Sequence, residues 1–324
     1  MGYPRHALIS LQETPYYHCV SRCVRRGWLC GYDEYADKDY SHRKQWIVDR
    51  FALLCEVYAI DICSYAVMSN HYHVDLYVDV ERARGWSERE VVQRWTSLHK
   101  NPEVVRRYLE QDVSLAQQDT AKEMIEQWRR RLMDVSWFMK ETNEYLARRA
   151  NAEDRCTGRF WEGRFRCQAQ LDEPALLTGM AYVDLNPIRA GIASTPEDSD
   201  YTSAQQRIQS MRGQPSQGPR LRRFKEFGDH GNSIPFSLES YLQLVDWTGR
   251  VIRDDKRGAI DDTLPPILIR LNIDKDAWIE SMRVKGNVFG RAMGKLNHLR
   301  IHAKALGQAW IKGLRHAERL YGTP

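Results

Sequence analysis

Residues 71–80 carry the pattern that most restricts what this chain can fold into. In HYHVDLYVDV, apolar or aromatic side chains stand at every second position from Tyr72 to Val80, and mostly polar ones alternate with them. This period of two predicts a strand with one face on a hydrophobic core and one polar face. Residues 60–68 form a second apolar run, and Ser69-Asn70 between the two is a tight-turn sequence. We therefore expect an antiparallel pair of strands at the centre of a sheet.

Helix and strand signals surround this pair. Residues 16–24 (YYHCVSRCV) predict a strand, and residues 41–58 predict a helix with a polar N-cap. A capping box at residues 87–90 starts a helical stretch. A later helix has Pro174 in its first turn and must end before Pro187. The order strand, helix, strand, strand, helix favours an α+β fold with an antiparallel sheet.

At about 100–200 residues per domain, a chain of 324 residues is expected to form two domains. We predict a catalytic domain over residues 1–205, with a helical insertion at about 86–134. The segment MRGQPSQGP is typical of a linker, which we place at 206–234. Residues 235–324 are then expected to form a mostly helical C-terminal region.

The net charge of +5 is small but unevenly distributed. Residues 281–316 contain eight Lys and Arg side chains and no Asp or Glu. Such a block predicts a polyanionic partner, although a solvated helix face explains a charge run equally well. We expect this C-terminal region to be a DNA-binding accessory.

Several other classes of protein are disfavoured. No run of 18 apolar residues and no apolar signal core are present, so we expect a cytoplasmic protein without a membrane partner. The seven cysteines include no CxxC pair, which favours thiols in a reducing compartment. Cys19, Cys23 and Cys30, or the pair His298 and His302, are weak zinc candidates because neither set supplies the usual four ligands.

His71 and His73 are the sharpest local feature. Residues two apart on a strand project from one face, about 7 Å apart along the chain. Two neutral imidazoles offer lone pairs that can hold a divalent cation, but two histidines exposed on a wet sheet face fit the pattern as well. HYHVD also matches the opening of the metallo-hydrolase pattern HxHxDH, where Leu76 stands in place of the last histidine.

Tyr182 and Asn186 form a second candidate pair. They lie at positions i and i+4 of a predicted helix and therefore share a face. The amide oxygen of Asn186 can complete a metal shell, and a tyrosine beside a polarised phosphate is a plausible covalent nucleophile. Taken alone, Tyr182 fits an ordinary amphipathic helix equally well.

Three segments together change this interpretation. MSNHYHV, GRFWEGRF and YVDLNPIRAGIA, in this order, resemble the REP-associated tyrosine transposases, which belong to the HUH (His-hydrophobic-His) single-strand endonuclease superfamily. The resemblance covers about residues 16–201 and implies a ferredoxin-like α+β core. It implies that His71 and His73 bind one Mg²⁺ or Mn²⁺, that Asn186 is a third metal-site residue, and that Tyr182 is the nucleophile.

The same resemblance implies an activity and a partner. The expected enzyme is a nucleoid-associated transposase that cleaves and rejoins single-stranded DNA beside a hairpin-forming palindrome, through a 5′-phosphotyrosine. Two alternatives stay open, a DNA-binding repressor that no longer cuts and a metallo-hydrolase. Monomer and homodimer are both compatible with the family.

The segment at residues 158–170 suits a surface for a DNA strand. Arginines meet phosphates, and aromatic rings stack bases at about 1–3 kcal/mol each. Alternatively, some of the aromatic residues belong to the core. The predicted contacts to DNA are Arg159, Arg164, Arg166, Trp161, Arg189, Arg291, Lys295, Arg300 and Lys304.

Overall fold

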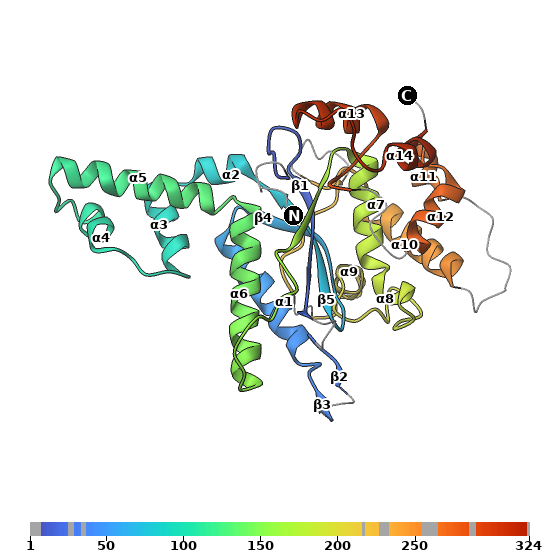
Figure 1. Ribbon diagram of the computed structural model, residues 1–324, viewed down its shortest axis with the longest axis horizontal. Coiled ribbons are helices and arrows are strands. Elements are labelled where there is room, and N and C mark those ends of the chain that lie inside the picture. The colour runs from blue at the N-terminus through green and yellow to red at the C-terminus, as the bar shows by residue number, and fades with distance from the viewer. Residues whose placement is uncertain are drawn as a thin grey trace.

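A five-stranded sheet forms the centre of the protein, with helices on both of its faces (Figure 1). The computed structural model describes residues 8–24, 29–33, 37–215, 218–226, 233–253, 265–284 and 290–322. The fold class is α+β with a mostly antiparallel sheet, as predicted. Within the described ranges, we find no helix with the length and apolar character needed to cross a bilayer.

The sheet has the strand order β4-β5-β1-β6-β7. Its antiparallel strands are β4 (Ile60–Val67), β5 (His71–Val78), β1 (Tyr16–Arg22) and β6 (Arg166–Gln170), with β4 at one edge. The short β7 (Ala292–Met293) adds to β6 in parallel, so part of the C-terminal region completes the sheet. β4 and β5 are joined at the predicted turn, as the sequence indicated.

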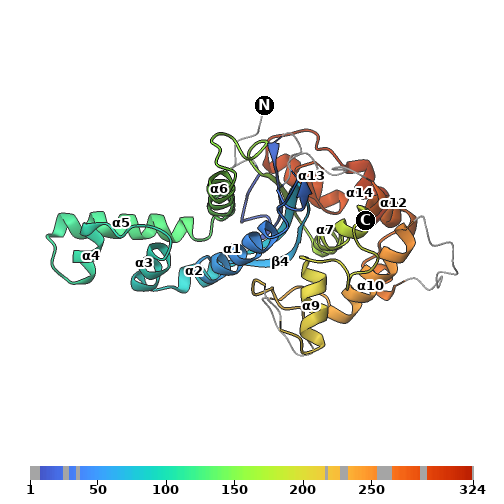
Figure 2. The same cartoon turned by 90° about the horizontal axis from the view of Figure 1, so that it is seen from below.

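One face of the sheet packs on two long helices. These are α1 (Arg43–Val57) and α6 (Val135–Glu153), which lie on the same side of the strands (Figure 2). Phe51 of α1 contacts Tyr72 of β5 with ring centroids 5.6 Å apart, and Phe138 of α6 stacks on Phe51. This is the apolar face that the alternating pattern of β5 predicted.

The other face of β5 is polar, but it is not open to solvent. It is covered by α7 (Glu173–Asp184), so that His73 is only 6% exposed and Asp75 is fully buried. His73 is therefore not exposed on a wet sheet face, whereas His71 at the start of the strand is only half-buried. Burial of these polar groups is tolerated because each has a hydrogen-bond partner, as described below.

A helical arm extends away from the sheet (Figure 1). Trp95 and Trp128 stack inside it with ring centroids 5.7 Å apart. The predicted capping box is present, because Ser87 and Glu90 bond each other's backbone N–H. The arm is built from α2 (Val80–Gly85), α3 (Glu88–Thr96), α4 (Glu103–Leu109) and α5 (Leu115–Arg131).

The remaining elements are two short strands that pair with each other in a separate sheet, and the helices that follow α7 in the sequence. They are β2 (Tyr32–Asp33), β3 (Lys38–Asp39), α8 (Asn186–Arg189), α9 (Ser203–Met211), α10 (Leu238–Ile252), α11 (Pro266–Arg270), α12 (Lys275–Arg283), α13 (Leu296–Ala305) and α14 (Leu314–Tyr321).

The limits of the two predicted domains stay a prediction. The structure does show what the predicted linker between them contacts. The end of α9 falls within 206–234, and Arg222 donates its backbone N–H to the carbonyl of Ile62 in β4 at 2.8 Å. Residues 216–217 and 227–232 of the predicted linker lie outside the described residues. Part of the predicted linker thus runs directly beside the sheet.

Buried Asp184 holds the helices around α7 together. Its carboxylate accepts hydrogen bonds from Ser203 Oγ at 2.5 Å and from the backbone of Ala204 at 2.9 Å, both in α9. It also accepts from the hydroxyl of Tyr241 in α10. One side chain of α7 therefore links the first part of the chain to a helix after the predicted linker.

Close packing of α7 on the sheet predicts a sensitive position at Gly179. A Cβ there would lie 1.9 Å from Nε2 of Gln170, a fully buried side chain that is itself hydrogen-bonded. We expect Gly179→Ala to lower the free energy of unfolding in urea by about 1–3 kcal/mol.

Gly85→Ala is the matched control, because nothing lies within 4 Å of the new methyl group. It should leave stability unchanged or raise it by up to about 1 kcal/mol. Equal stability of the two variants would show that α7 is not packed as closely as described.

Candidate active site

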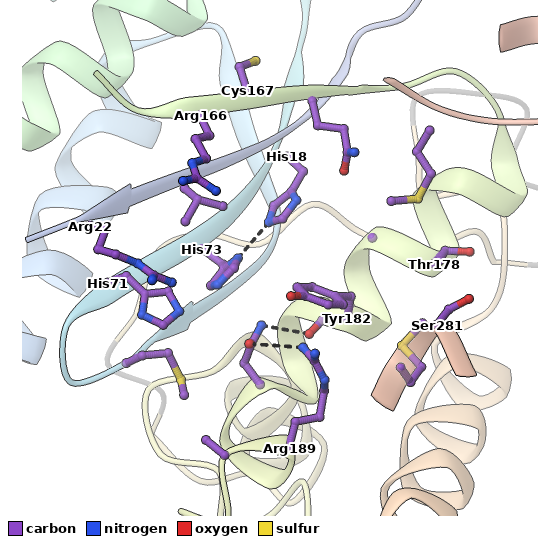
Figure 3. Close-up of a pocket in the computed structure, with 18 of the residues that line it drawn as sticks. His18, Arg22, His71, His73, Arg166, Cys167, Thr178, Tyr182, Arg189 and Ser281 are labelled. Atoms are coloured by element: carbon purple, nitrogen blue, oxygen red, sulfur yellow. Dashed lines mark hydrogen bonds between the residues drawn. The ribbon is translucent and has the colours of Figure 1, made fainter. Parts of the chain in front are cut away.

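His71 and His73 line a cavity of about 700 Å³ between the sheet and α7 (Figure 3). Both project from the same face of β5, as the period of two predicted. Their ring centroids are 4.9 Å apart. Tyr182, Asn186 and Arg189 line the same cavity, so residues more than 100 positions apart in the sequence meet there.

The two histidines are held in different ways. His71 Nδ1 lies 2.5 Å from Oδ1 of its neighbour Asn70. His73 Nδ1 lies 2.9 Å from Nε2 of His18, which comes from β1. In both rings Nδ1 therefore has a hydrogen-bond partner in the protein, and Nε2 is the nitrogen that remains for a ligand.

Burial keeps these imidazoles neutral. It lowers the pKa of His71 to about 4, helped by the charge of Arg22, and it lowers the pKa of His18 to about 4. The pKa of His73 is held well below its ordinary value, first by burial and then by the neighbouring histidines. A neutral imidazole keeps the lone pair that a metal ion requires.

Tyr182 lies at the C-terminal end of α7, directly across the cavity from the histidines. Its ring centroid is 5.9 Å from that of His73 and 6.2 Å from that of His18. The side chain is half-buried, and the guanidinium of Arg189 lies 4.1 Å from its ring centroid. The structure thus brings the predicted nucleophile and the predicted metal-binding histidines to one cavity.

Asn186 lines the cavity but has other hydrogen-bond partners. Its Nδ2 donates to the carbonyl of Tyr182 at 2.9 Å, and its Oδ1 accepts from Arg189 at 3.4 Å. Arg189 in turn donates to the carbonyl of Val284 at 2.6 Å. A metal-binding role for Asn186 stays a proposal, because its oxygen would have to be shared with or released by Arg189.

The donor set fits a divalent ion in part. Two neutral histidines line the cavity, which suits a borderline or hard divalent cation with open positions. Among the described residues, no cluster of three or more His, Cys, Asp or Glu side chains could hold a metal ion. Within this part of the chain, a further ligand would be an amide oxygen such as that of Asn186, water or the substrate.

Positive charge lies around the histidines. Arg22 and Arg166 line the cavity, both are exposed, and neither forms a salt bridge within the described residues. Figure 3 shows Arg22 beside His71 and Arg189 beside Tyr182. Arg166 and Arg189 were predicted as DNA contacts, whereas Arg22 was not.

The other predicted DNA contacts lie outside the cavity lining. Arg159 and Arg164 are exposed on the loop before β6. Trp161 is half-buried, donates its indole N–H to the carbonyl of Asn143 at 2.8 Å and packs edge-on against Tyr72. It therefore supports the core, which agrees with the alternative interpretation of this segment.

The basic C-terminal candidates lie on or next to α13. Arg300 and Lys304 are exposed one turn apart on α13, while Arg291 and Lys295 are half-buried. The backbone N–H of Lys295 donates to Asp172 at the start of α7. These residues could form a separate contact to DNA, and that role stays a prediction.

The weak zinc candidates have other roles in the structure. His298 Nδ1 lies 2.7 Å from a carboxylate oxygen of Asp172, and His302 Nδ1 lies 2.6 Å from that of Glu13. The seven cysteines form no disulfide, and six of them are buried.

His18, like Arg22, is a residue of the site that the sequence did not reveal. It stands in an ordinary strand pattern, YYHCV, with no motif around it. Only the register of β1 against β5 places it beside His73, 55 positions away. A signal could have come from the prediction that both strands present polar residues to one face.

Asp75 lies deeper on the same polar face, beneath α7. Its carboxyl accepts hydrogen bonds from Ser64 Oγ at 2.5 Å and from Gln170 Nε2 at 2.7 Å. Burial raises its pKa from 3.8 to about 7, although the two hydrogen bonds oppose this shift. The carboxyl therefore keeps its proton to a higher pH in the folded protein than it would in water.

The chain was compared with known proteins. No protein family matches, and no similar sequence was found among curated proteins. Among solved structures, the chain is similar to "Structure of the REP associates tyrosine transposase bound to a REP hairpin". The sequence identity is 12%, the match covers 72% of this chain and 97% of that chain, and the TM-score is 0.38.

The raised pKa of Asp75 predicts a pH dependence of stability. The folded state holds this proton more tightly than the unfolded state, so the contribution of Asp75 is present below pH 4 and is lost as pH rises toward 7. Relative to Asp75→Asn, the free energy of unfolding should fall over this range by roughly 4 kcal/mol at most.

Urea unfolding of both proteins at several pH values measures this difference. The lowered pKa values of the histidines change stability with pH in the opposite direction. Because both proteins contain the same histidines, this effect cancels in the comparison with Asp75→Asn. Parallel stability curves for the two proteins would contradict the raised pKa.

Proposed function

We propose that this protein is a metal-dependent endonuclease and strand transferase for single-stranded DNA, with Tyr182 as the nucleophile. One observation carries the proposal. The half-buried phenol of Tyr182 lies across a cavity from two neutral histidines on one strand, with ring centroids 5.9 Å apart for His73, and arginines stand at the rim. Two of the three sequence segments that resemble those of tyrosine transposases, MSNHYHV and YVDLNPIRAGIA, supply Tyr182 and both histidines.

The chemistry balances without an added energy source. The Tyr182 hydroxyl gives up its proton as its oxygen bonds to a backbone phosphorus. The bond from phosphorus to the 3′ oxygen breaks, and that oxygen takes up a proton. The products are a 5′-phosphotyrosine and a 3′ hydroxyl. Since the ester bond is conserved, a second 3′ hydroxyl can reverse the step and join the strand elsewhere.

His71 and His73 would hold one Mg²⁺ or Mn²⁺, with Asn186 as a third residue. When bound, the ion would neutralise charge on a non-bridging oxygen of the phosphate. The protein's own part is to keep both imidazoles neutral and to engage their Nδ1 atoms, which leaves the Nε2 atoms for the ion. Arg189 keeps its guanidinium over the Tyr182 ring, which limits the positions that the phenol can adopt.

The proposed substrate is a single strand. The nucleophile lies inside a cavity rather than on a flat surface, so one phosphate must enter between the sheet and α7. A flexible strand can do so, whereas a stiff duplex would first have to be opened. A palindrome folded into a hairpin beside the cleavage site is supported by the sequence resemblance. The exposed Arg300 and Lys304 are candidates for contacting its stem.

The first test is covalent capture. Labelled single-stranded hairpin oligonucleotides from the DNA around the gene are incubated with the protein and Mn²⁺, and then run on a denaturing protein gel. We expect a labelled band at the combined mass, which EDTA should abolish. In Tyr182→Phe the band should weaken by at least about 100-fold, because the attacking oxygen is gone.

Tyr108→Phe is the matched control, because it removes a hydroxyl in the arm that donates to Glu88, far from the cavity lining. A band in Tyr182→Phe equal to that of Tyr108→Phe would end the assignment of the nucleophile. Cleavage that needs the histidines but not Tyr182 would favour the metallo-hydrolase. DNA binding without cleavage, on a substrate that tyrosine transposases cut, would favour the repressor.

The arginines at the rim predict a change in DNA affinity. Removal of Arg22 and Arg166 together should weaken single-strand binding. It should also reduce the slope of log K against log salt by about 0.7 for each DNA phosphate that is no longer neutralised. Fluorescence anisotropy at several salt concentrations, without metal, measures both quantities.

The double variant Arg84→Ala with Arg106→Ala changes the net charge equally. Both of these arginines are exposed and pair with acidic residues of their own helices. An equal loss of affinity in the two double variants would mean that only total charge matters and that the rim is not a phosphate-binding surface.

A further inference from the structure

His18 and Gln168 form a hydrogen-bonded chain that ends at His73. Gln168 lies opposite His18 in the register of β1 and β6, and its side chain hydrogen-bonds His18. The Nε2 of Gln168 donates to the carbonyl of Gly290 at 3.1 Å. The chain therefore runs from a residue just before β7 through β6 and β1 to β5.

The backbone carbonyl at one end of this chain determines where each proton lies. The oxygen of Gly290 can only accept, so the amide nitrogen of Gln168 must face it and the amide oxygen must face His18. His18 Nε2 is already engaged with His73, so Nδ1 is the atom that donates to Gln168. His18 Nε2 then has a lone pair rather than a proton.

The same logic extends to His73. Because His18 Nε2 accepts, His73 Nδ1 must be the donor of the 2.9 Å hydrogen bond. The lone pair of His73 is thereby placed on Nε2, the nitrogen that is left for the cavity. His71 reaches the same state by a shorter route, because Oδ1 of Asn70 accepts from its Nδ1.

We propose that His18, held by Gln168 and Gly290, is a positioning residue that fixes the tautomer and the orientation of His73 for a divalent metal ion. This inference rests on the proposed function, since it assigns the use of His73 Nε2. His18 itself makes no bond to the ion. The C-terminal region contributes to the site through the carbonyl of Gly290, although none of its arginines or lysines is needed for this effect.

The burial of these three hydrogen-bonded side chains explains how they can hold the proton on one nitrogen of His73. His18 is 8% exposed, Gln168 is 7% exposed and His73 is 6% exposed, so water competes poorly for their hydrogen bonds. A partner behind a metal-binding histidine usually fixes its ring and raises its affinity for the ion, and loss of such a partner typically costs about 10–100-fold in affinity.

The tautomer can be read in the unaltered protein. Long-range ¹H–¹⁵N spectra of the metal-free protein, with labelled histidine, distinguish a proton on Nδ1 from one on Nε2. We expect His73 to carry its proton on Nδ1 and His18 on Nδ1, with assignment by loss of each signal in single replacements. A proton on Nε2 of His73 would overturn the proposal and needs no folded variant of His18.

The effect on the metal is measured by titration with Mn²⁺ alone, without DNA. His18→Leu should raise the dissociation constant by about 10–100-fold. His18→Gln should restore most of the affinity, because its amide oxygen can still accept from His73 Nδ1. His42→Gln is the control, since His42 is half exposed and pairs with Glu153 on the other side of the sheet.

The outcomes separate this inference from the proposed function. Unchanged Mn²⁺ affinity in folded His18→Leu would overturn the positioning role and leave the nucleophile assignment intact. A shift in both tautomer and affinity would support the role of His18 even if Tyr182→Phe later proves able to form a DNA adduct.

Discussion

The structure depends on the packing of one helix, α7, against the polar face of the sheet. Helices usually cover apolar faces, and burial of polar groups costs free energy unless each finds a partner. Here Asp75 pairs with Ser64 and Gln170, and His73 pairs with His18. The absence of a side chain at Gly179 lets the helix approach this hydrogen-bonded layer. Gly179 itself lines the cavity together with Tyr182, so the cavity lies directly beside this close contact.

That packing explains why the site contains residues from so many elements. Tyr182 lies three residues after Gly179, so the contact that holds α7 to the sheet also determines the distance from the phenol to the histidines. The N-terminal end of α7 is held by its N-cap Asp172, which bonds the backbone of Lys295 and the ring of His298. Asp184 holds the C-terminal end of α7 through hydrogen bonds with α9 and α10.

The C-terminal region is therefore part of the same framework. It supplies β7, the Gly290 carbonyl, and the hydroxyl of Tyr321, which donates to Thr178 in α7 at 3.0 Å. Its basic charge led us to expect an accessory surface for DNA, and the exposed face of α13 remains suited to that. The structure adds a second use for this region, because its hydrogen bonds fix the helix that carries the candidate nucleophile.

Local patterns were enough to predict the α+β class, the strand pair, the histidines that share a face and the helix that carries Tyr182. Each of these depends on residues within one turn or a few strand positions of one another, where the period of the backbone decides which side chains share a face. Burial of the histidines, the partnership of His18 with His73 and the engagement of Asn186 by Arg189 could not be obtained in this way. They depend on strand register and on the height of α7 above the sheet, which are set by contacts between segments far apart in the chain.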